Sequence, residues 1–337
     1  MLKLILSRLA GAIPNIIGVV IVTFILTRAL PGDPAAFFAG PSATKEAIEE
    51  VRKSLGLDAP LIVQFGRYVR DLGQGKLGNS LSTGQPVVTE LVTRLPASLE
   101  LTLAGLLFAT VIAIPLGILA ATRPSSWIDH LCRVLATAGV SLPTFFTGLL
   151  LAYIFYFKLG ISPSPIGRLD PTFVSPPTVT GFYLIDSLLV RDLELFIGAA
   201  KQLILPAVTL GLFVMAPLAR MTRASMLGVL SSDFVRTARA SGLSGMTVLF
   251  TYAFRNALLP VVTTMGMVFS FLLGSNVLVE KVFAWPGIGS YAIEALISSD
   301  YAPVQGFVLA MALLYVLLNL SIDILYGIID PRVGLEA

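Results

Sequence analysis

Six long apolar runs, separated by polar segments, set the pattern of the chain. They cover residues 9–29, 99–121, 135–157, 203–219, 258–279 and 304–329. Because a transmembrane helix needs about 20 largely apolar residues, each run is of a length that can cross a bilayer. Prolines inside several runs are compatible with this, since neighbouring helices satisfy the carbonyl groups that a proline leaves unpaired. The pattern predicts an all-α polytopic membrane protein with six transmembrane helices.

The polar segments between the runs divide the chain. Residues 30–96 form the longest segment and are interpreted as a separate domain, while 158–201 and 280–303 are the other long connections. The apolar stretches 182–189 and 193–200 are too short to span a bilayer, and we expect them to be surface or re-entrant helices. The predicted parts are therefore the N-terminus with the first helix (1–29), the separate domain (30–96) and the membrane core (97–337).

Basic residues are concentrated in two of the shorter connections. Arg123 and Arg133 flank the connection between the second and third runs. The connection between the fourth and fifth runs carries Arg220, Arg223, Arg236, Arg239 and Arg255. Because cytoplasmic loops are enriched in lysine and arginine, both termini and these two connections are predicted to be cytoplasmic. The segment 30–96 is then external, and its own basic residues do not contradict this because long loops are largely exempt from the rule.

Composition supports a place in the lipid bilayer and argues against a nucleic-acid partner, an intrachain disulfide and a histidine-rich metal site. The 337 residues are 55% hydrophobic and only 13% charged, whereas soluble domains carry about 25% charged residues. The net charge of +3 includes no basic run interleaved with aromatic residues, so nucleic acid is not an expected partner. One cysteine, Cys132, and one histidine, His130, provide neither an intrachain disulfide nor a histidine-rich metal site.

Motifs for nucleotide binding and hydrolysis are missing from the sequence. There is no G-x-x-x-x-G-K-[ST] loop, and residues 73–76 (GQGK) are only a fragment of one. Neither H-E-x-x-H nor G-x-S-x-G occurs. An enzyme within the membrane needs a base beside a nucleophile or a metal. We therefore predict that the chain is not an enzyme and holds no cofactor or metal of its own.

A polar stretch of 28 residues, 233–260, lies between the fourth and fifth apolar runs and reads DFVRTARASGLSGMTVLFTYAFRNALLP. We expect a first helix, a break at Gly242 and a second helix that begins at Ser244 and runs to the end of the stretch. Ser231 and Ser232 are expected N-caps, and a glycine in the left-handed conformation commonly ends a helix. On composition alone, an amphipathic loop resting on the membrane surface explains the same stretch.

The amino-acid sequence of this stretch resembles the cytoplasmic loop of permease subunits in ABC importers. The matching positions are an acidic residue, an alanine, a glycine and a distant Leu-Pro: Asp233, Ala238, Gly242, Leu259 and Pro260. The strings VRTARASGL and RNALLP are similar to the dipeptide/oligopeptide (peptide/nickel/opine) branch of that family, first-permease type. The same branch is resembled by PGDP at 31–34, Gly-Leu-Asp-x-Pro at 56–60, LGNS at 77–80 and DPR at 330–332.

The resemblance covers nearly the whole chain, with three departures from the family pattern. Asp233 stands where a glutamate often begins the loop motif, Ser241 where a lysine is common, and Gln202 where a histidine is common. These departures leave the family assignment intact. They do not permit the substrate of any one relative to be transferred to this chain.

The resemblance implies a fold, a set of partners and a docking site. The fold is that of a type I ABC importer permease, with an external domain between helices 1 and 2. The expected partners are a second homologous permease, two cytoplasmic ATPase subunits that hold ATP and Mg, and an external binding protein. The docking loop is placed at 225–256. The residues expected to couple to the ATPase are Asp233, Arg236, Thr237, Ala238, Arg239, Gly242, Leu259 and Pro260.

Four polar side chains and one methionine inside the last two apolar runs are candidates for lining a transport pathway. They are Thr263, Met267, Ser270, Asn276 and Asp323. Ionisable groups inside a bilayer are costly and usually face a cavity or a partner, but small and polar residues also serve helix packing. For Asp323, pairing with an arginine near the inner surface is favoured over a gating or lining role. The expected cargo is a dipeptide or oligopeptide, with glutathione, nickel complexes and opine-like compounds as alternatives. A self-sufficient channel or secondary transporter is the alternative of another class.

Overall fold

The computed structural model describes residues 2–29, 33–40 and 42–329. Within its helices, the side chains of residues 2–10, 26–29, 34, 37, 38, 136, 138, 140, 323 and 325–329 lie outside the described part. Regular structure in the described residues is helical. The chain forms two compact units. One comprises Leu99–Trp285 and the segment from Leu318 onward, and the other comprises Leu2–Ser98 and Pro286–Leu317.

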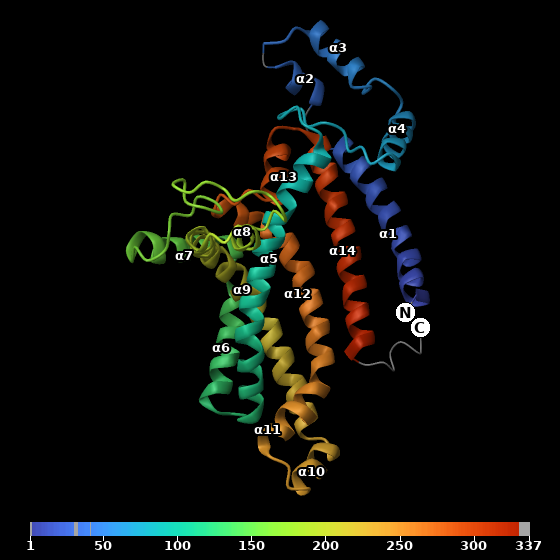
Figure 1. Cartoon of the computed structure of the whole chain (residues 1–337). Coiled ribbons are helices and arrows are strands. Elements are labelled where there is room, and N and C mark those ends of the chain that lie inside the picture. Colours follow the sequence, from blue (N-terminus) through green and yellow to red (C-terminus); the bar gives the residue numbers. More distant parts are fainter. Residues whose placement is uncertain (1, 30–32, 41, 330–337) are drawn as a thin grey trace. The chain divides into compact units, whose positions relative to one another are not determined.

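The first unit is a bundle of helices packed around α9 (Leu193–Leu230) (Figure 1). Its other elements are the larger part of α5 (Val87–Thr122), α6 (Trp127–Ser141), α7 (Thr144–Leu151), η1 (Ala152–Lys158), α8 (Tyr183–Leu189), α10 (Asp233–Ala240), α11 (Gly245–Thr247), η2 (Val248–Phe254), α12 (Arg255–Val282) and the end of α14 (Tyr301–Ile329). Helix α9 contacts α6, α7, α8 and α12. Of its most apolar 18-residue window, 72% is buried, which makes α9 the core of this unit.

Small residues allow the helices of the first unit to approach closely. A Cβ atom added to Gly117 of α5 would lie 2.7 Å from the Cβ atom of Thr222 on α9. A Cβ atom added to Gly211 of α9 would lie 2.8 Å from the carbonyl oxygen of Gly105 on α5. Close backbone contact through glycine is a common way for helices to associate in a bilayer, where the lipid offers no hydrophobic driving force.

The second unit consists of α1 (Leu2–Ala29), α2 (Pro34–Ala39), α3 (Lys45–Ser54), α4 (Leu61–Gly73), the start of α5, α13 (Ile288–Ile297) and the start of α14. Phe24 of α1 packs edge-on against Phe65 of α4, with ring centroids 5.2 Å apart. Val87 of α5 is fully buried with Ile288 and Tyr291 of α13. Two of the short helices, α3 and α4, lie within the polar segment 30–96.

Among the residues that the structure describes, four helices are long and apolar enough to cross a membrane. They are Val87–Thr122, Leu193–Leu230, Gly245–Val282 and Tyr301–Ile322. These contain the second, fourth, fifth and most of the sixth predicted runs. The first predicted run lies in α1, of which Gly11–Ile25 counts as a shorter apolar helix. The coarse prediction of an all-α membrane protein is therefore confirmed.

Two expectations about individual elements are wrong. The third apolar run is not one helix, because α6 ends at Ser141 and α7 begins at Thr144, after Leu142 and Pro143. Proline disfavours a helical conformation in the residue that precedes it, which explains the break. The stretch 193–200 is not a separate short helix, because it is the first part of α9. Asp192 caps that helix by accepting the backbone N–H of Leu195 at 2.9 Å.

Candidate functional site

Helix α10 lies at one end of the first unit (Figure 1). Its charged side chains are exposed. Asp233 stands in its first turn with its side chain 93% exposed, where a negative charge suits the positive end of the helix dipole. Arg236 lies one turn later, and its Nη1 is 3.2 Å from Oδ1 of Asp233. Thr237 and Arg239 are also exposed. Four of the predicted docking residues therefore point away from the chain that carries them.

The opposite face of α10 is anchored in an apolar cluster. Val235 is fully buried and Ala238 is 5% exposed. They pack with Ile118 of α5, Met226 of α9 and Val248 of η2. The sequence pattern grouped Ala238 with the docking residues. The structure instead places it in the apolar cluster that anchors α10. Three separate elements support α10, so it cannot move without moving them.

The turns on either side of α10 agree only in part with prediction. Ser232 stands at the N-cap position, but its hydroxyl donates to the carbonyl oxygen of Val229 at 2.6 Å and makes no cap hydrogen bond. Gly242 has φ +76° and follows the end of the helix, as predicted. Ser244 caps the next helix by accepting the N–H of Thr247 at 3.2 Å, also as predicted.

Helix continues from Gly245 to Val282 without a linker. It begins as α11, passes through the π-helical segment η2 and becomes α12. Leu259 is half-buried and Pro260 is exposed, and both lie in the first two turns of α12. Single-turn π-helical segments inside α-helices occur frequently at functional sites. The corner at Gly242 is therefore joined directly to a long apolar helix.

The pathway candidates fall into three groups. Thr263, Met267 and Ser270 follow helical spacing on one face of α12, and Met267 is 61% exposed. Asn276 is buried, and its Nδ2 donates to Oγ1 of Thr102 at 3.2 Å and to Oε1 of Glu280 at 3.1 Å. Asn276 therefore ties α12 to α5, which is the helix-packing alternative. The side chain of Asp323 lies outside the described residues.

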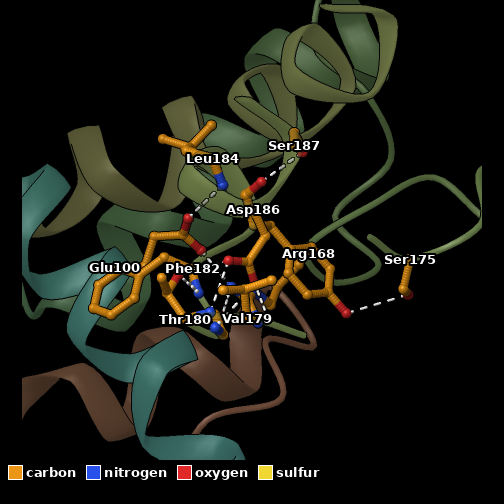
Figure 2. A network of polar contacts seen from close by, with 11 residues as sticks. Glu100, Arg168, Ser175, Val179, Thr180, Phe182, Leu184, Asp186 and Ser187 are labelled. Atoms are coloured by element: carbon orange, nitrogen blue, oxygen red, sulfur yellow. Dashed lines mark hydrogen bonds and ion pairs between the residues drawn. The ribbon is translucent and has the colours of Figure 1, made fainter. Parts of the chain in front are cut away.

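A buried ion pair lies elsewhere in the same unit (Figure 2). Glu100 of α5 and Arg168 of the loop before α8 are 5% and 7% exposed, with Nη2 of the arginine 2.5 Å from Oε2 of the glutamate. The same Nη2 donates to the carbonyl oxygen of Gly181 at 2.8 Å. Oε1 of Glu100 accepts the N–H of Leu184 at 2.9 Å. The guanidinium also lies 3.5 Å from the ring centroid of Tyr183.

Asp186 closes the loop that carries these groups. Its carboxylate accepts the N–H groups of Val179, Thr180 and Gly181, and the hydroxyl of Thr180 at 2.7 Å (Figure 2). Burial alone would raise the pKa of Asp186, but these hydrogen bonds outweigh it and hold the pKa below its ordinary value. We call Glu100, Arg168, Tyr183 and Asp186 the loop clamp, since they fasten the loop and α8 to α5.

Comparisons with known proteins decide the family. A family model described as "Binding-protein-dependent transport system inner membrane component" matches residues 113–335. A second, described as "Binding-prot-dependent transport system membrane comp, N-term", matches residues 1–102. The chain belongs to this family. It is accordingly a multi-pass permease component of the inner membrane, and the predicted family is confirmed.

Full-length relatives share this family. The probable D,D-dipeptide transport system permease protein DdpB of Escherichia coli (strain K12) is 46% identical over 328 residues, which are 97% of this chain and 96% of the relative. The di/tripeptide transport system permease protein DppB of Pseudomonas aeruginosa (strain UCBPP-PA14) is 45% identical over 334 residues, 99% of each chain. A permease component is not an enzyme, since separate ATPase subunits hydrolyse the ATP in such systems.

A solved structure shows the same fold. The inward-facing MetNI methionine ABC transporter contains a chain that matches with a TM-score of 0.54 and 18% sequence identity. The match covers 72% of this chain and 97% of that one. The fold of the chain is therefore that of an ABC importer permease.

Sequence reasoning missed several residues that the structure brings to attention. Phe234 is 45% exposed beside Asp233 on α10, although an aromatic residue after an acidic one is no recognisable signal by itself. Arg168 lies in the proline-rich loop before α8 and Asp186 in the first turn of α8, and neither was singled out. A signal for Arg168 was available in Glu100, because a carboxylate at the edge of an apolar run requires a partner.

Proposed function

We propose that this permease subunit imports dipeptides or short oligopeptides, driven by ATP that separate ATPase subunits hydrolyse. The main observation in support of coupling to an ATPase is the structure of α10. One face is held by Val235 and Ala238, while Asp233, Phe234 and Arg236 are presented outward. A short helix with an anchored face and a free, mixed apolar and charged face suits insertion into a groove on another protein.

The docking site extends beyond α10 in this proposal. Arg239 and Thr237 complete the contact with the ATPase, and Gly242 sets the corner after it. Leu259 and Pro260 lie in the continuous helix that leads from this corner into the membrane, and they make no contact with the ATPase. Closure of two ATPase subunits would then pull two docking helices together and move the membrane helices between outward-open and inward-open forms. A rigid connection between groove and membrane helices is the physical requirement for such coupling.

The proposed topology has six transmembrane helices with both termini in the cytoplasm. The clustered arginines on both sides of α10 support this orientation under the positive-inside rule. In this arrangement α1 and the α6–α7 pair supply the two crossings beyond the four long helices. Residues 30–96, 158–201 and 280–303 then face the external binding protein, which would deliver the cargo.

The proposed pathway lies between this chain and a second, homologous permease. The face of α12 with Thr263, Met267 and Ser270 supports this assignment, because it carries polar and flexible side chains and Thr263 and Met267 are exposed. Peptide cargo is supported by the names of the relatives, which describe D,D-dipeptide and di/tripeptide transport. Glutathione, nickel complexes and opine-like compounds are the competing cargoes.

Two matched glycine substitutions test the docking proposal. Gly242 and Gly245 are both exposed, and an added Cβ atom at either would meet nothing within 4 Å. Only Gly242 has a left-handed backbone, a conformation that costs a non-glycine residue about 1–2 kcal/mol. We expect Gly242→Asp to insert in the membrane normally, to lose co-purification of the ATPase and to abolish uptake of a labelled dipeptide. Gly245→Asp should retain both.

The outcomes separate the functions. Undiminished uptake and ATPase co-purification in Gly242→Asp would sink the docking proposal. Transport of dipeptide by the purified single chain in liposomes, without any ATPase, would instead favour a self-sufficient channel or secondary transporter. Uptake of labelled glutathione or a labelled nickel complex, without uptake of labelled dipeptide, would replace the peptide with that cargo.

A further inference from the structure

A buried carboxylate joins the start of α6 to the end of α9. Asp129 lies in the first turn of α6, and its side chain is 2% exposed. Its Oδ1 accepts Nε of Arg223 at 2.6 Å and its Oδ2 accepts Nη2 of the same arginine at 2.9 Å. Bidentate pairs of this kind fix the relative orientation of the two groups as well as their distance.

The surroundings of Asp129 show that the pair is built into the fold. Oδ2 also accepts the N–H of Ser125 at 3.0 Å, and Ser125 is one of few non-glycine residues with positive φ, at 61°. Such a backbone conformation persists only where its surroundings hold it. The hydrogen bonds from Arg223 keep the pKa of Asp129 at about 2, so the carboxylate is ionised throughout the physiological range.

Arg223 lies close in sequence to the apolar cluster that anchors the docking helix α10. Met226 follows it by one helical turn on α9 and is fully buried. Met226 packs in the cluster that contains Val235 and Ala238 of α10. The end of α9 is therefore held by α6 through Arg223 and carries α10 through Met226.

A second close contact between α6 and α9 lies farther along both helices. A Cβ atom added to Gly139 of α6 would lie 2.5 Å from the carbonyl oxygen of Leu212 on α9, so the two backbones touch there. Gly139 is ten residues beyond Asp129, a distance of about 15 Å along a helix. Two fixed points set the angle between α6 and α9. Loss of the ion pair would remove one of these two points and leave the contact at Gly139.

We propose that Asp129 and Arg223 form a positioning pair that makes α6 follow α9 when the docking helix moves, and that ATP hydrolysis is poorly coupled to transport without it. This inference rests on the proposed docking function of α10. Neither residue is proposed to touch the ATPase or the cargo. The pair acts through the angle between two helices, which the ion pair maintains during each cycle of the transporter.

The test uses the complete transporter in proteoliposomes, with its binding protein and a labelled dipeptide. ATP hydrolysed and dipeptide accumulated are measured together for wild type, Asp129→Asn and Arg223→Gln. We expect the ATPase to co-purify and to hydrolyse ATP, while dipeptide transported per ATP falls about tenfold, within the usual range of coupling between sites. Arg223→Lys, which keeps the charge but loses the bidentate fork, should give an intermediate ratio.

Arg133→Gln is the matched control. Arg133 also faces Asp129, with Nη2 3.7 Å from Oδ2, but it is 53% exposed and belongs to α6 itself. Its loss breaks no link between α6 and α9, and the transport ratio should stay at the wild-type value. An equal fall in Arg133→Gln and Arg223→Gln would overturn the proposal, since local charge would then be the cause.

The double variant Asp129→Asn/Arg223→Gln guards against misfolding. It leaves no unpaired buried charge, so it should assemble better than either single variant. Continued low transport per ATP in the assembled double variant supports a positioning role, whereas a wild-type ratio overturns it. Failure of the wild-type chain to bind any ATPase would contradict the docking function itself, and is distinguished from these outcomes by the Gly242→Asp comparison.

Discussion

The loop clamp offers a quantitative test of what holds the first unit together. Arg168→Met removes the cation beside Glu100, which is 5% exposed in the wild-type chain, and leaves the N–H of Leu184 as a remaining donor. Removing one partner of a buried ion pair costs about 3–5 kcal/mol, because the other charge stays buried without compensation. We therefore expect the free energy of unfolding of Arg168→Met to fall by about that amount.

The double variant Glu100→Gln/Arg168→Met should be less damaged than Arg168→Met alone. The glutamine oxygen can still accept the N–H of Leu184, and no charge is left in the apolar surroundings. What is lost is mainly the stacking of the guanidinium on Tyr183, which is worth about 2 kcal/mol in a desolvated site. The double-mutant cycle should then give a coupling energy of about 1–3 kcal/mol between the two residues.

Trp285 supplies the assay. It is fully buried, and its ring centroid is 5.9 Å from the guanidinium carbon of Arg168. The chain has two tryptophans, and the other, Trp127, is 73% exposed. In a Trp127→Phe background, fluorescence during chemical denaturation in mixed micelles follows Trp285 alone. Arg133→Met serves as the comparison, since an exposed arginine should cost at most about 1 kcal/mol.

A double variant as unstable as Arg168→Met would refute the reasoning. The loss in the single variant would then come from packing of the long side chain rather than from an unpaired carboxylate. Arg168→Lys distinguishes the two further. It keeps a charge beside Glu100 but cannot reproduce the planar fork that reaches both Glu100 and Gly181, so its stability should lie between wild type and Arg168→Met.

Five further substitutions test individual contacts. Val235→Ala removes two fully buried methyl groups and should lower stability by about 2 kcal/mol, measured by thermal denaturation of the purified complex. Phe234→Ala, at an exposed site, should leave stability unchanged but weaken ATPase binding about tenfold in a titration, as for an aromatic anchor. Gly117→Ala forces α5 from α9 and should destabilise the complex, whereas Gly274→Ala, with nothing within 4 Å, should add up to about 1 kcal/mol. Because its arginine partner lowers the pKa of Asp129 to about 2 from 3.8, stability from this carboxylate is complete above about pH 4 and lost toward pH 2; Asp129→Asn should lack that acid-induced loss.

Much of the region around α10 was predictable from sequence because glycine and serine act locally. Gly242 is left-handed and Ser244 is an N-cap, as their positions predicted. Ser232 was different, because a serine hydroxyl both donates and accepts. Its oxygen turns back to Val229 and satisfies the end of α9, so the competing helix end decided its role.

The limits of α9 were not predictable from the apolar pattern. Gln202 follows Lys201 and was interpreted as polar sequence outside the membrane run, yet Gln202 is buried in a continuous helix. The helix instead begins at Asp192, whose capping side chain is a clearer signal than hydropathy. Pro206 and Pro217 lie inside it and do not end it, as expected where neighbouring helices surround the backbone.

The buried polar ties could not be derived from sequence at all. Glu100 and Arg168 are 68 residues apart in sequence, and Asp129 and Arg223 are 94 apart. No local pattern identifies which arginine meets which carboxylate, because tertiary packing brings the pairs together. The sequence indicated only that charges at the edges of apolar runs require partners.

The two buried ties restrict where the first unit can bend. The positioning pair holds the end of α9 near α10. The loop clamp holds together α5, the loop before α8, and α8. Within that loop, the N–H of Gly167 also donates to the carbonyl oxygen of Phe283 at 3.0 Å. Between the docking corner and α12 lies η2, where the hydrogen-bonding pattern of the helix is already altered. Pro260 follows in α12 and has no N–H for a helical hydrogen bond. Kinks occur at these two kinds of position, so bending of α12 should concentrate between Val248 and Pro260, where it would redirect the exposed face that follows.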